Sequence, residues 1–235
     1  MGGGLFITGT DTGVGKTFIA CGLAGLLRES GYRVGVMKPA ETGCQERDGQ
    51  LVPEDAVRLK EASGCEEPLE KICPYRLKDS LAPSVAAERS GVTIDIGLIQ
   101  KLYDEISSKH DITIVEGAGG LLVPILSHYT YADLAKLLKL PLVVVAANRL
   151  GAINHLLLTL EHASWRGLRV LGYIWNNLDS QPSLAAESNT EALRFLTAVP
   201  CVGEIPHVDG EPSSPAVLFE ETLDRLWGAL ALDRR

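Results

Sequence analysis

The sequence predicts an α/β protein with three layers, in which helices cover both faces of a mostly parallel central sheet. Three observations lead to this prediction. Short apolar runs alternate along the chain with segments of helical periodicity, as they do in βαβ units. The run Leu142–Ala147 has no polar face, which is typical of a parallel strand buried on both sides. A glycine-rich loop joins the first expected strand to the first expected helix.

In the first part of the chain, strands and helices are bounded by clear start and stop signals. Leu5–Thr8 is an apolar strand, and the helix Lys16–Ser30 stops at Gly31. Arg33–Met37 is the second strand. A helix then opens at Pro53, since proline is tolerated at the first helical position.

The alternation continues to the end of the chain. The expected elements are the helix Ile94–Ser107, the strands Ile112–Val115 and Leu142–Ala147, a helix over Asn154–Trp165, the strand Arg169–Trp175 and a helix over Ser183–Ala198. An acidic loop, Asp209–Pro215, is expected before a short terminal helix. No linker or repeat interrupts this pattern, so residues 1–235 are expected to form a single domain.

Composition narrows the function classes. The 235 residues carry 22 Lys and Arg against 30 Asp and Glu, a net charge of −8. This excess of acid opposes binding to nucleic acid or to an anionic membrane. The five cysteines show no disulfide or zinc spacing, and Met1–Gly4 lacks the basic start of a secretory signal. We therefore expect a cytoplasmic protein with reduced thiols.

The glycine-rich loop, Gly9–Thr17, reads GTDTGVGKT. Backbone N–H groups in such a loop can surround a polyphosphate, and the following helix N-terminus adds positive potential. Lys16 is then expected on the β- and γ-phosphates and the Thr17 hydroxyl on Mg²⁺. The loop is a variant, because the strict pattern has glycine at Thr10; a tight turn with an incidental Gly-Lys-Thr is the alternative. The loop does not match a dinucleotide-binding motif, because that motif requires a third glycine at the position of Phe18.

Three further charged residues follow expected strands or open an expected helix. Ligands of open parallel sheets bind beyond the carboxyl ends of the strands, and Glu116 closes one strand there. Its carboxylate suits Mg²⁺, although an acid can also simply end a strand. Asp55 is either a second ligand or a residue that complements the helix dipole. Lys38 ends the second strand, either solvated or facing the γ-phosphate, where it would stabilise charge during phosphoryl transfer.

Together these motifs resemble those of the dethiobiotin synthetase family. The matching segments, spread over residues 4–207, are Gly9–Thr17, Lys38-Pro39 with Thr42-Gly43, Glu54–Ala56, Val115–Gly120, Leu150–His155, Asn176-Asn177 and Gly203–Pro206. The resemblance implies a P-loop NTPase-like domain that uses ATP and Mg²⁺. It also implies ATP-dependent carboxylation and ring closure of 7,8-diaminopelargonate with CO₂ or bicarbonate, through a carbamate and a carbamic–phosphoric anhydride.

Residue roles are carried over from the same resemblance. Lys38 and Lys16 are the implied catalytic residues, and Thr17, Asp55 and Glu116 the implied ligands of Mg²⁺. Thr42, Gly151 and Asn154 are implied to meet substrate, the last two across a homodimer interface. The implied nucleotide contacts are Thr12, Gly13, Val14, Gly15, Lys16, Thr17, Phe18, Asp55, Glu116, Gly117, Ala118, Gly119, Asn176, Asn177, Pro206 and His207.

The chain departs from the family pattern at a few positions. Arg149 stands where some members have a lysine, Gly13 replaces an acidic residue, and Thr42 replaces a frequent serine. Two other functions fit parts of the pattern. A partitioning-type nucleotide switch would carry a lysine where this chain has Asp11, and an ATP-dependent amidoligase for another acid would differ in the substrate segments.

Overall fold

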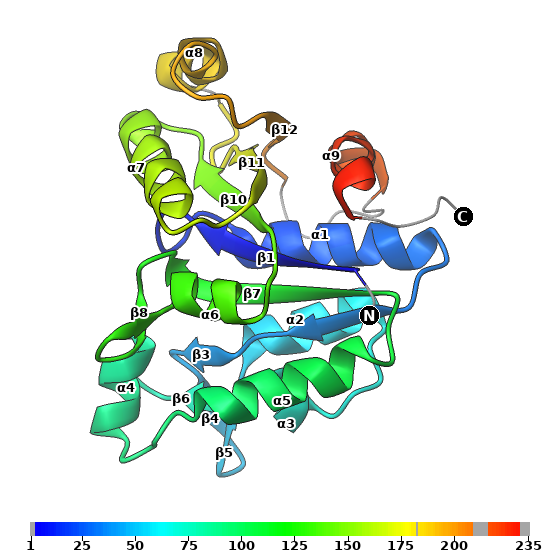
Figure 1. The fold of residues 1–235 in the computed structure, drawn as a ribbon, viewed down its shortest axis with the longest axis vertical. Coiled ribbons are helices and arrows are strands. Elements are labelled where there is room, and N and C mark those ends of the chain that lie inside the picture. Colours follow the sequence, from blue (N-terminus) through cyan, green and yellow to red (C-terminus); the bar gives the residue numbers. More distant parts are fainter. Residues whose placement is uncertain (1–2, 182, 209–215, 231–235) are drawn as a thin grey trace.

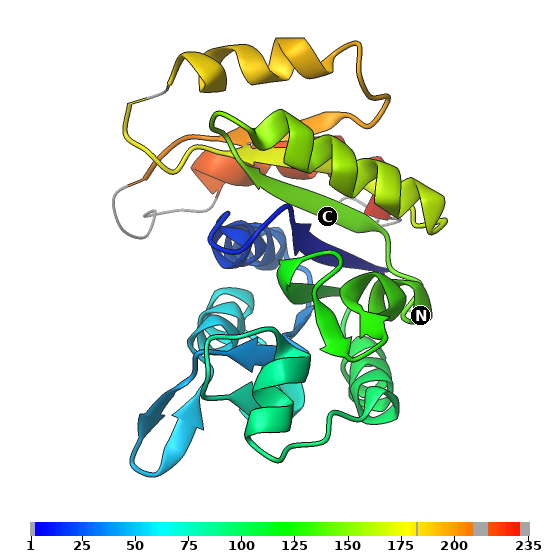
Figure 2. The same cartoon turned by 90° about the vertical axis from the view of Figure 1, so that its left-hand side faces the viewer.

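The computed structural model describes residues 3–181, 183–208 and 216–230. Its central sheet has six strands in the order β12-β11-β10-β1-β7-β2, and every neighbouring pair is parallel. Helices lie on both sides of this sheet (Figures 1 and 2). The predicted three-layer α/β fold is therefore confirmed. The sheet strands are β1 (Gly3–Gly9), β2 (Val34–Met37), β7 (Ile112–Gly120), β10 (Leu142–Ala147), β11 (Val170–Asn176) and β12 (Cys201–Ile205).

The helices and the small strands complete the described chain. The helices are α1 (Lys16–Glu29), α2 (Glu54–Ser63), α3 (Leu69–Ile72), α4 (Pro83–Arg89), α5 (Ile96–Ser107), α6 (Tyr131–Leu137), α7 (Ala152–Trp165), α8 (Leu184–Leu193) and α9 (Ala216–Leu230). Three two-stranded sheets pair β3 (Ala40–Thr42) with β6 (Tyr75–Leu77), β4 (Gln45–Arg47) with β5 (Gln50–Val52), and β8 (Pro124–Leu126) with β9 (Tyr129–Thr130).

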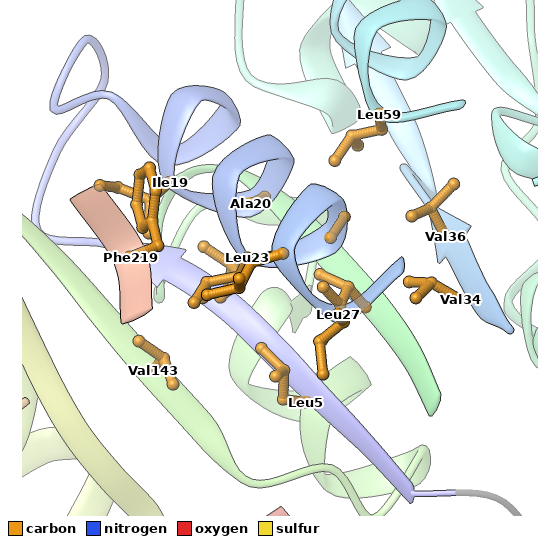
Figure 3. Close-up of a cluster of buried hydrophobic side chains, with 14 of the residues drawn as sticks. Leu5, Ile19, Ala20, Leu23, Leu27, Val34, Val36, Leu59, Val143 and Phe219 are labelled. Atoms are coloured by element: carbon orange, nitrogen blue, oxygen red, sulfur yellow. The ribbon is translucent and has the colours of Figure 1, made fainter. Parts of the chain in front are cut away.

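The core is divided by the sheet, because successive strand residues point to opposite faces. Leu5 and Val143 lie in a cluster under α1, α2 and α9, whereas Phe6 and Val144 face α5, α6 and α7. Figure 3 shows the first cluster, with Phe219 of α9 among the side chains of α1. Complete burial of one such large side chain contributes about 1.5–3 kcal/mol.

Several boundaries differ from the sequence-based expectation. The helix expected over Ser183–Ala198 ends at Leu193, and the terminal helix α9 has 15 residues rather than being short. The short elements α3, α4, α6, β3–β6, β8 and β9 were not expected, because they are too brief to show a periodicity. The predicted loop Asp209–Pro215 lies outside the described residues. Among the helices that the structure describes, none has the length and apolarity needed to cross a membrane.

Candidate active site

The phosphate loop connects β1 to α1 at the carboxyl edge of the sheet, where ligands of parallel sheets bind. Gly13 and Gly15 both adopt left-handed backbone conformations, with φ of 74° and 90°. At Gly15 a side chain is also excluded by space, since a Cβ atom would lie 2.0 Å from Nδ2 of Asn176. That amide donates to the carbonyl oxygen of Val14 at 3.0 Å. Glycine is thus required at the start of α1, and Asn176 fixes the loop from β11.

Lys16, the lysine of this loop, is buried and folds back over it. Its Nζ donates to the carbonyl oxygen of Asp11 at 3.1 Å. Burial and the neighbouring ammonium of Lys38 lower the pKa of Lys16 to about 8. The charged form of Lys16 is therefore disfavoured in the folded protein, and an anionic ligand such as a polyphosphate would stabilise it.

Lys38 lies just beyond the end of β2 and is 2% exposed. Its Nζ donates to Asp55 Oδ2 at 2.8 Å and to Glu116 Oε1 at 2.6 Å. Burial alone would lower the pKa of Lys38, but the attraction of Glu116 and Asp55 outweighs it and raises that pKa above its usual value. The ammonium stays charged because two carboxylates contact it, that of Glu116, which is fully buried, and that of Asp55, whose side chain is 39% exposed.

The residues expected to hold Mg²⁺ converge from three elements: α1, α2 and β7. Thr17 Oγ1 donates to Glu116 Oε1 at 2.8 Å. The other oxygen of Glu116, Oε2, is buried without a hydrogen-bond partner among the described residues. Burial would raise the pKa of Asp55, but Lys38 lowers it below its usual value, so Asp55 is ionised at neutral pH. A hydroxyl and two carboxylates are hard oxygen donors, so these residues fit Mg²⁺.

A cavity of about 700 Å³ opens above these residues. It receives side chains from the phosphate loop, from β3, from the first turns of α2 and α4, and from the end of β7. The expected site residues that line it are Thr12, Gly13, Gly15, Lys16, Thr17, Phe18, Lys38, Thr42, Asp55, Glu116, Ala118 and Gly119. Gly117 lies beside it, and its carbonyl oxygen is 3.5 Å from Lys38 Nζ.

The expected base-binding residues lie at the other end of the sheet, where β10, β11 and β12 finish. Asn176 closes β11, and Pro206 and His207 follow β12. Asn177 Nδ2 donates to Glu204 Oε1 at 3.3 Å. None of these residues lines the 700 Å³ cavity, although Asn176 also contacts the phosphate loop through the carbonyl oxygen of Val14.

Gly151 and Asn154 occupy the start of α7. Gly151 is the N-cap, with φ of 87°, and Asn154 is exposed in the first turn. A second cavity of about 550 Å³ separates α7 from the phosphate loop and is lined by His155 and Asp11, among others. Arg149, which replaces a lysine of the family pattern, is exposed on the preceding loop and lines neither cavity.

Sequence reasoning missed two polar residues of the site. Glu41 in β3 is buried, lines the larger cavity and accepts hydrogen bonds from the first turn of α2. Burial raises the pKa of Glu41 to about 7. Asn148, at the end of β10, is buried in a network of amides. Neither belongs to a spacing pattern, although the position of Glu41, three residues after Lys38, indicates that it lies near the site.

Comparisons with known proteins show the class to which the chain belongs. A family described as an AAA domain matches residues 3–210, so the chain belongs to that class of P-loop domains. The cell division ATPase MinD of Pyrococcus furiosus superposes with a TM-score of 0.56 at 16% identity, over 97% of this chain and all of that one. A ParA family ATPase from Chlorobium tepidum gives 0.55 at 15% identity, over 99% and 95%. At such identities the likeness concerns the fold alone.

Relatives of higher sequence identity show to which enzyme family within this class of P-loop domains the chain belongs. The ATP-dependent dethiobiotin synthetase BioD of Aromatoleum aromaticum is 42% identical over 205 residues, which cover 87% of this chain and 91% of that protein. The enzyme of the same name from Bacillus licheniformis is 40% identical over 98% of this chain and 96% of its own length. The chain belongs to the ATP-dependent dethiobiotin synthetase family, as its motifs predicted, and is thus an enzyme of the ligase class.

Proposed function

We propose that this chain uses ATP to close the ureido ring of dethiobiotin from 7,8-diaminopelargonate and CO₂, with bicarbonate as the source of CO₂. The observation that supports this most directly is the position of Lys38. It lies between Asp55 and Glu116 in the cavity that the phosphate loop lines, in a chain of the dethiobiotin synthetase family. We expect the reaction in the cytoplasm, where ATP is available.

ATP binding is the first proposed step. The N–H groups of residues 13–18 and the start of α1 surround the β- and γ-phosphates, and Lys16 exchanges its contact with the Asp11 carbonyl for phosphate oxygens. At the far end of the sheet, Asn176 and Asn177 read the adenine edge between Pro206 and His207. The phosphate contacts supply charge compensation, whereas the base contacts supply selectivity.

The chemical steps follow from the groups that the cavity gathers. One substrate amine forms a bond to CO₂ and loses a proton, which gives a carbamate. A carbamate oxygen then bonds to the γ-phosphorus as the bond from that phosphorus to ADP breaks. Lys38 and Lys16 stabilise the charge on the transferring phosphoryl group, while Thr42 and the segment 116–119 orient the reactants. The second amine attacks the carbamoyl carbon, loses its proton, and phosphate leaves.

Magnesium fits the proposed reaction through residues that already converge. Thr17, Asp55 and Glu116 would hold the ion, and the unpartnered Oε2 of Glu116 is available to it. When bound, Mg²⁺ would neutralise charge on the phosphate oxygens. The ammonium of Lys38 donates to both Asp55 and Glu116. To stabilise the phosphoryl group, it has to exchange part of these contacts for phosphate oxygens.

We also propose that the chain forms a homodimer in which Gly151 and Asn154 of one copy approach the substrate of the other. The support is the apolar surface next to these residues. Leu150 is 87% exposed and Leu158 is 58% exposed, and Leu158 lines the second cavity. Burial of such side chains favours association. Sedimentation at assay concentration should give a dimer, and a strict monomer would contradict this part of the proposal.

An ADP-release assay tests the proposed reaction. Release should require 7,8-diaminopelargonate, bicarbonate and Mg²⁺ together, and mass spectrometry should detect dethiobiotin in equal amount to ADP. Omission of bicarbonate from degassed buffer is the matched control. ADP release that is independent of 7,8-diaminopelargonate would refute the proposed substrate, and it would point to a nucleotide switch instead.

A further inference from the structure

Helix α2 begins without a cap from its own N-cap residue, which is Pro53. The first N–H groups of a helix have no partner inside the helix, so they need an acceptor from elsewhere. Glu41 supplies it: Oε1 accepts from the Asp55 N–H and Oε2 accepts from the Ala56 N–H, both at 3.0 Å. The cap of α2 is therefore a carboxylate from another element, the strand β3.

The cap of α5 is built in a different way. Asp95 caps α5 from the adjacent N-cap position, through bonds from Gly97 and Leu98. Asp95 is exposed, whereas Glu41 is buried. Burial of a carboxylate is costly unless hydrogen bonds compensate it, and here each oxygen of Glu41 receives one backbone N–H bond. The buried carboxylate therefore joins β3 to the first turn of α2 in a fixed geometry.

The elements that Glu41 joins are those that carry the reacting groups. The segment 38–42 holds Lys38, Glu41 and Thr42 within five residues, and all three line the cavity. The first turn of α2 holds Asp55, whose Oδ2 lies 2.8 Å from Lys38 Nζ. The bond from the Asp55 N–H to Glu41 thus fixes the same residue whose carboxylate contacts Lys38. One side chain sets the distance between the segment and the helix.

We propose that Glu41 is a positioning residue, which caps α2 from β3 and thereby holds Asp55 against Lys38 in the geometry that the metal and the phosphoryl group require. The inference rests on the proposed function for the identity of the metal and the nucleotide. In this role Glu41 acts through Asp55, because its own oxygens accept hydrogen bonds from backbone N–H groups.

The test is nucleotide binding with and without Mg²⁺ in Glu41→Gln. The amide keeps one acceptor and replaces the other with a donor, so one N–H of α2 loses its partner. Calorimetry with AMP-PNP should show affinity about tenfold weaker than wild type in Mg²⁺, the factor expected for loss of one hydrogen bond to a charged group. In EDTA the affinities should be equal. Glu41→Asp, which keeps the charge but shortens the reach, should lose less affinity in Mg²⁺.

Asp95→Ala is the matched control, since it removes a helix cap away from the cavity. Both Glu41→Gln and Asp95→Ala should lower the urea midpoint of unfolding, but only the former should change the Mg²⁺-dependent affinity. Equal Mg²⁺-dependent affinities in Glu41→Gln and wild type would refute the positioning role. Should Glu41→Gln not fold, equal affinities in Glu41→Asp and wild type would refute it as well. These measurements need no 7,8-diaminopelargonate, so failure of the proposed substrate in the ADP-release assay is a separate outcome.

Discussion

The two ends of the sheet's carboxyl edge differ in the charge of their polar groups. At β1, β2 and β7 the groups are charged, and Lys38 shares its ammonium with Asp55 and Glu116. At β10, β11 and β12 they are mostly neutral amides, where Asn148 connects to Asn177 and Asn189. Buried charges depend on their partners far more than amides do, because an unpaired charge loses its hydration without compensation. The charged end is therefore suited to polyphosphate chemistry, and the neutral end to orientation.

The largest effect is expected from Lys38→Met, which removes the shared cation of the charged end. Turnover should fall at least ~100-fold, since a donor that stabilises the transferring phosphoryl group is lost. The free energy of unfolding should fall by about 3–5 kcal/mol, because Asp55 and Glu116 are left without their counter-charge. ADP release and urea denaturation measure the two effects.

A double variant separates these two roles of Lys38. Lys38→Met combined with Glu116→Gln removes one stranded carboxylate, so it should regain part of the stability of Lys38→Met without regaining turnover. Wild-type turnover in Lys38→Met would remove this lysine from the mechanism. An unchanged urea midpoint would show that the carboxylates are hydrated once the lysine is gone.

Lys16→Met should reduce turnover at least ~100-fold as well, for the same loss of phosphate stabilisation. Its stability effect should be opposite to that of Lys38→Met. Burial and Lys38 lower the pKa of Lys16 to about 8, which means that its ammonium is held at a cost in the folded protein. At pH 7 the urea midpoint of the variant should therefore equal or exceed that of wild type. A midpoint as low as that of Lys38→Met would contradict the contrast between the two lysines.

The charged end could largely be predicted from the sequence, whereas the neutral end could not. Lys38 follows a parallel strand and Thr17 lies in the first turn of the helix after one, and such positions meet at one edge of the sheet. Glu116 was expected to close a strand that ends at Val115, but β7 continues to Gly120 and Glu116 lies within it. Asn148 bonds to residues 29 to 56 positions later in the chain, and amides show no spacing that predicts such contacts. The family resemblance pointed to Asn176 and Asn177 but gave no account of what holds them.

Glu41 shows why part of the charged end was missed too. Its partners are backbone N–H groups of Asp55 and Ala56, which carry no side-chain signal. Its strand β3 has three residues, too few for an alternation to be seen. The packing of α9 on α1 was not predicted for a similar reason. Phe219 of α9 lies so close to α1 that a Cβ atom at Gly22 would be 2.1 Å from its ring, but these segments are far apart in the sequence and only the fold brings them together.

Asp55→Ala tests the metal side of the charged end with a smaller effect. The Mg²⁺ concentration for half-maximal ADP release should rise at least about tenfold, since even residues that only support a metal ligand commonly cost that much. At saturating Mg²⁺ the KM for 7,8-diaminopelargonate should stay near that of wild type. An unchanged Mg²⁺ titration would show that Asp55 is not a metal ligand and that its carboxylate only complements the dipole of α2.

The smallest effect is expected from Asn148→Ala at the neutral end. Asn148 Nδ2 donates to Asn177 Oδ1 at 3.0 Å, and its Oδ1 accepts from Asn189 Nδ2 at 2.8 Å. Loss of these bonds should destabilise the fold by about 1–3 kcal/mol, the range for buried polar groups that lose a partner. kcat should stay within about twofold of wild type, because no charge near the phosphates changes.

Asn189→Ala is the matched partner of that variant, since Asn189 also donates to the carbonyl oxygen of Arg149 at 3.3 Å. The double variant should be less destabilised than the sum of the two single variants, because they share one hydrogen bond. A fall in kcat as large as that of Lys38→Met would show that the amides take part in phosphoryl transfer. The contrast between a charged, reactive end and a neutral, orienting end would then be wrong, since both ends would act on the same reacting atoms.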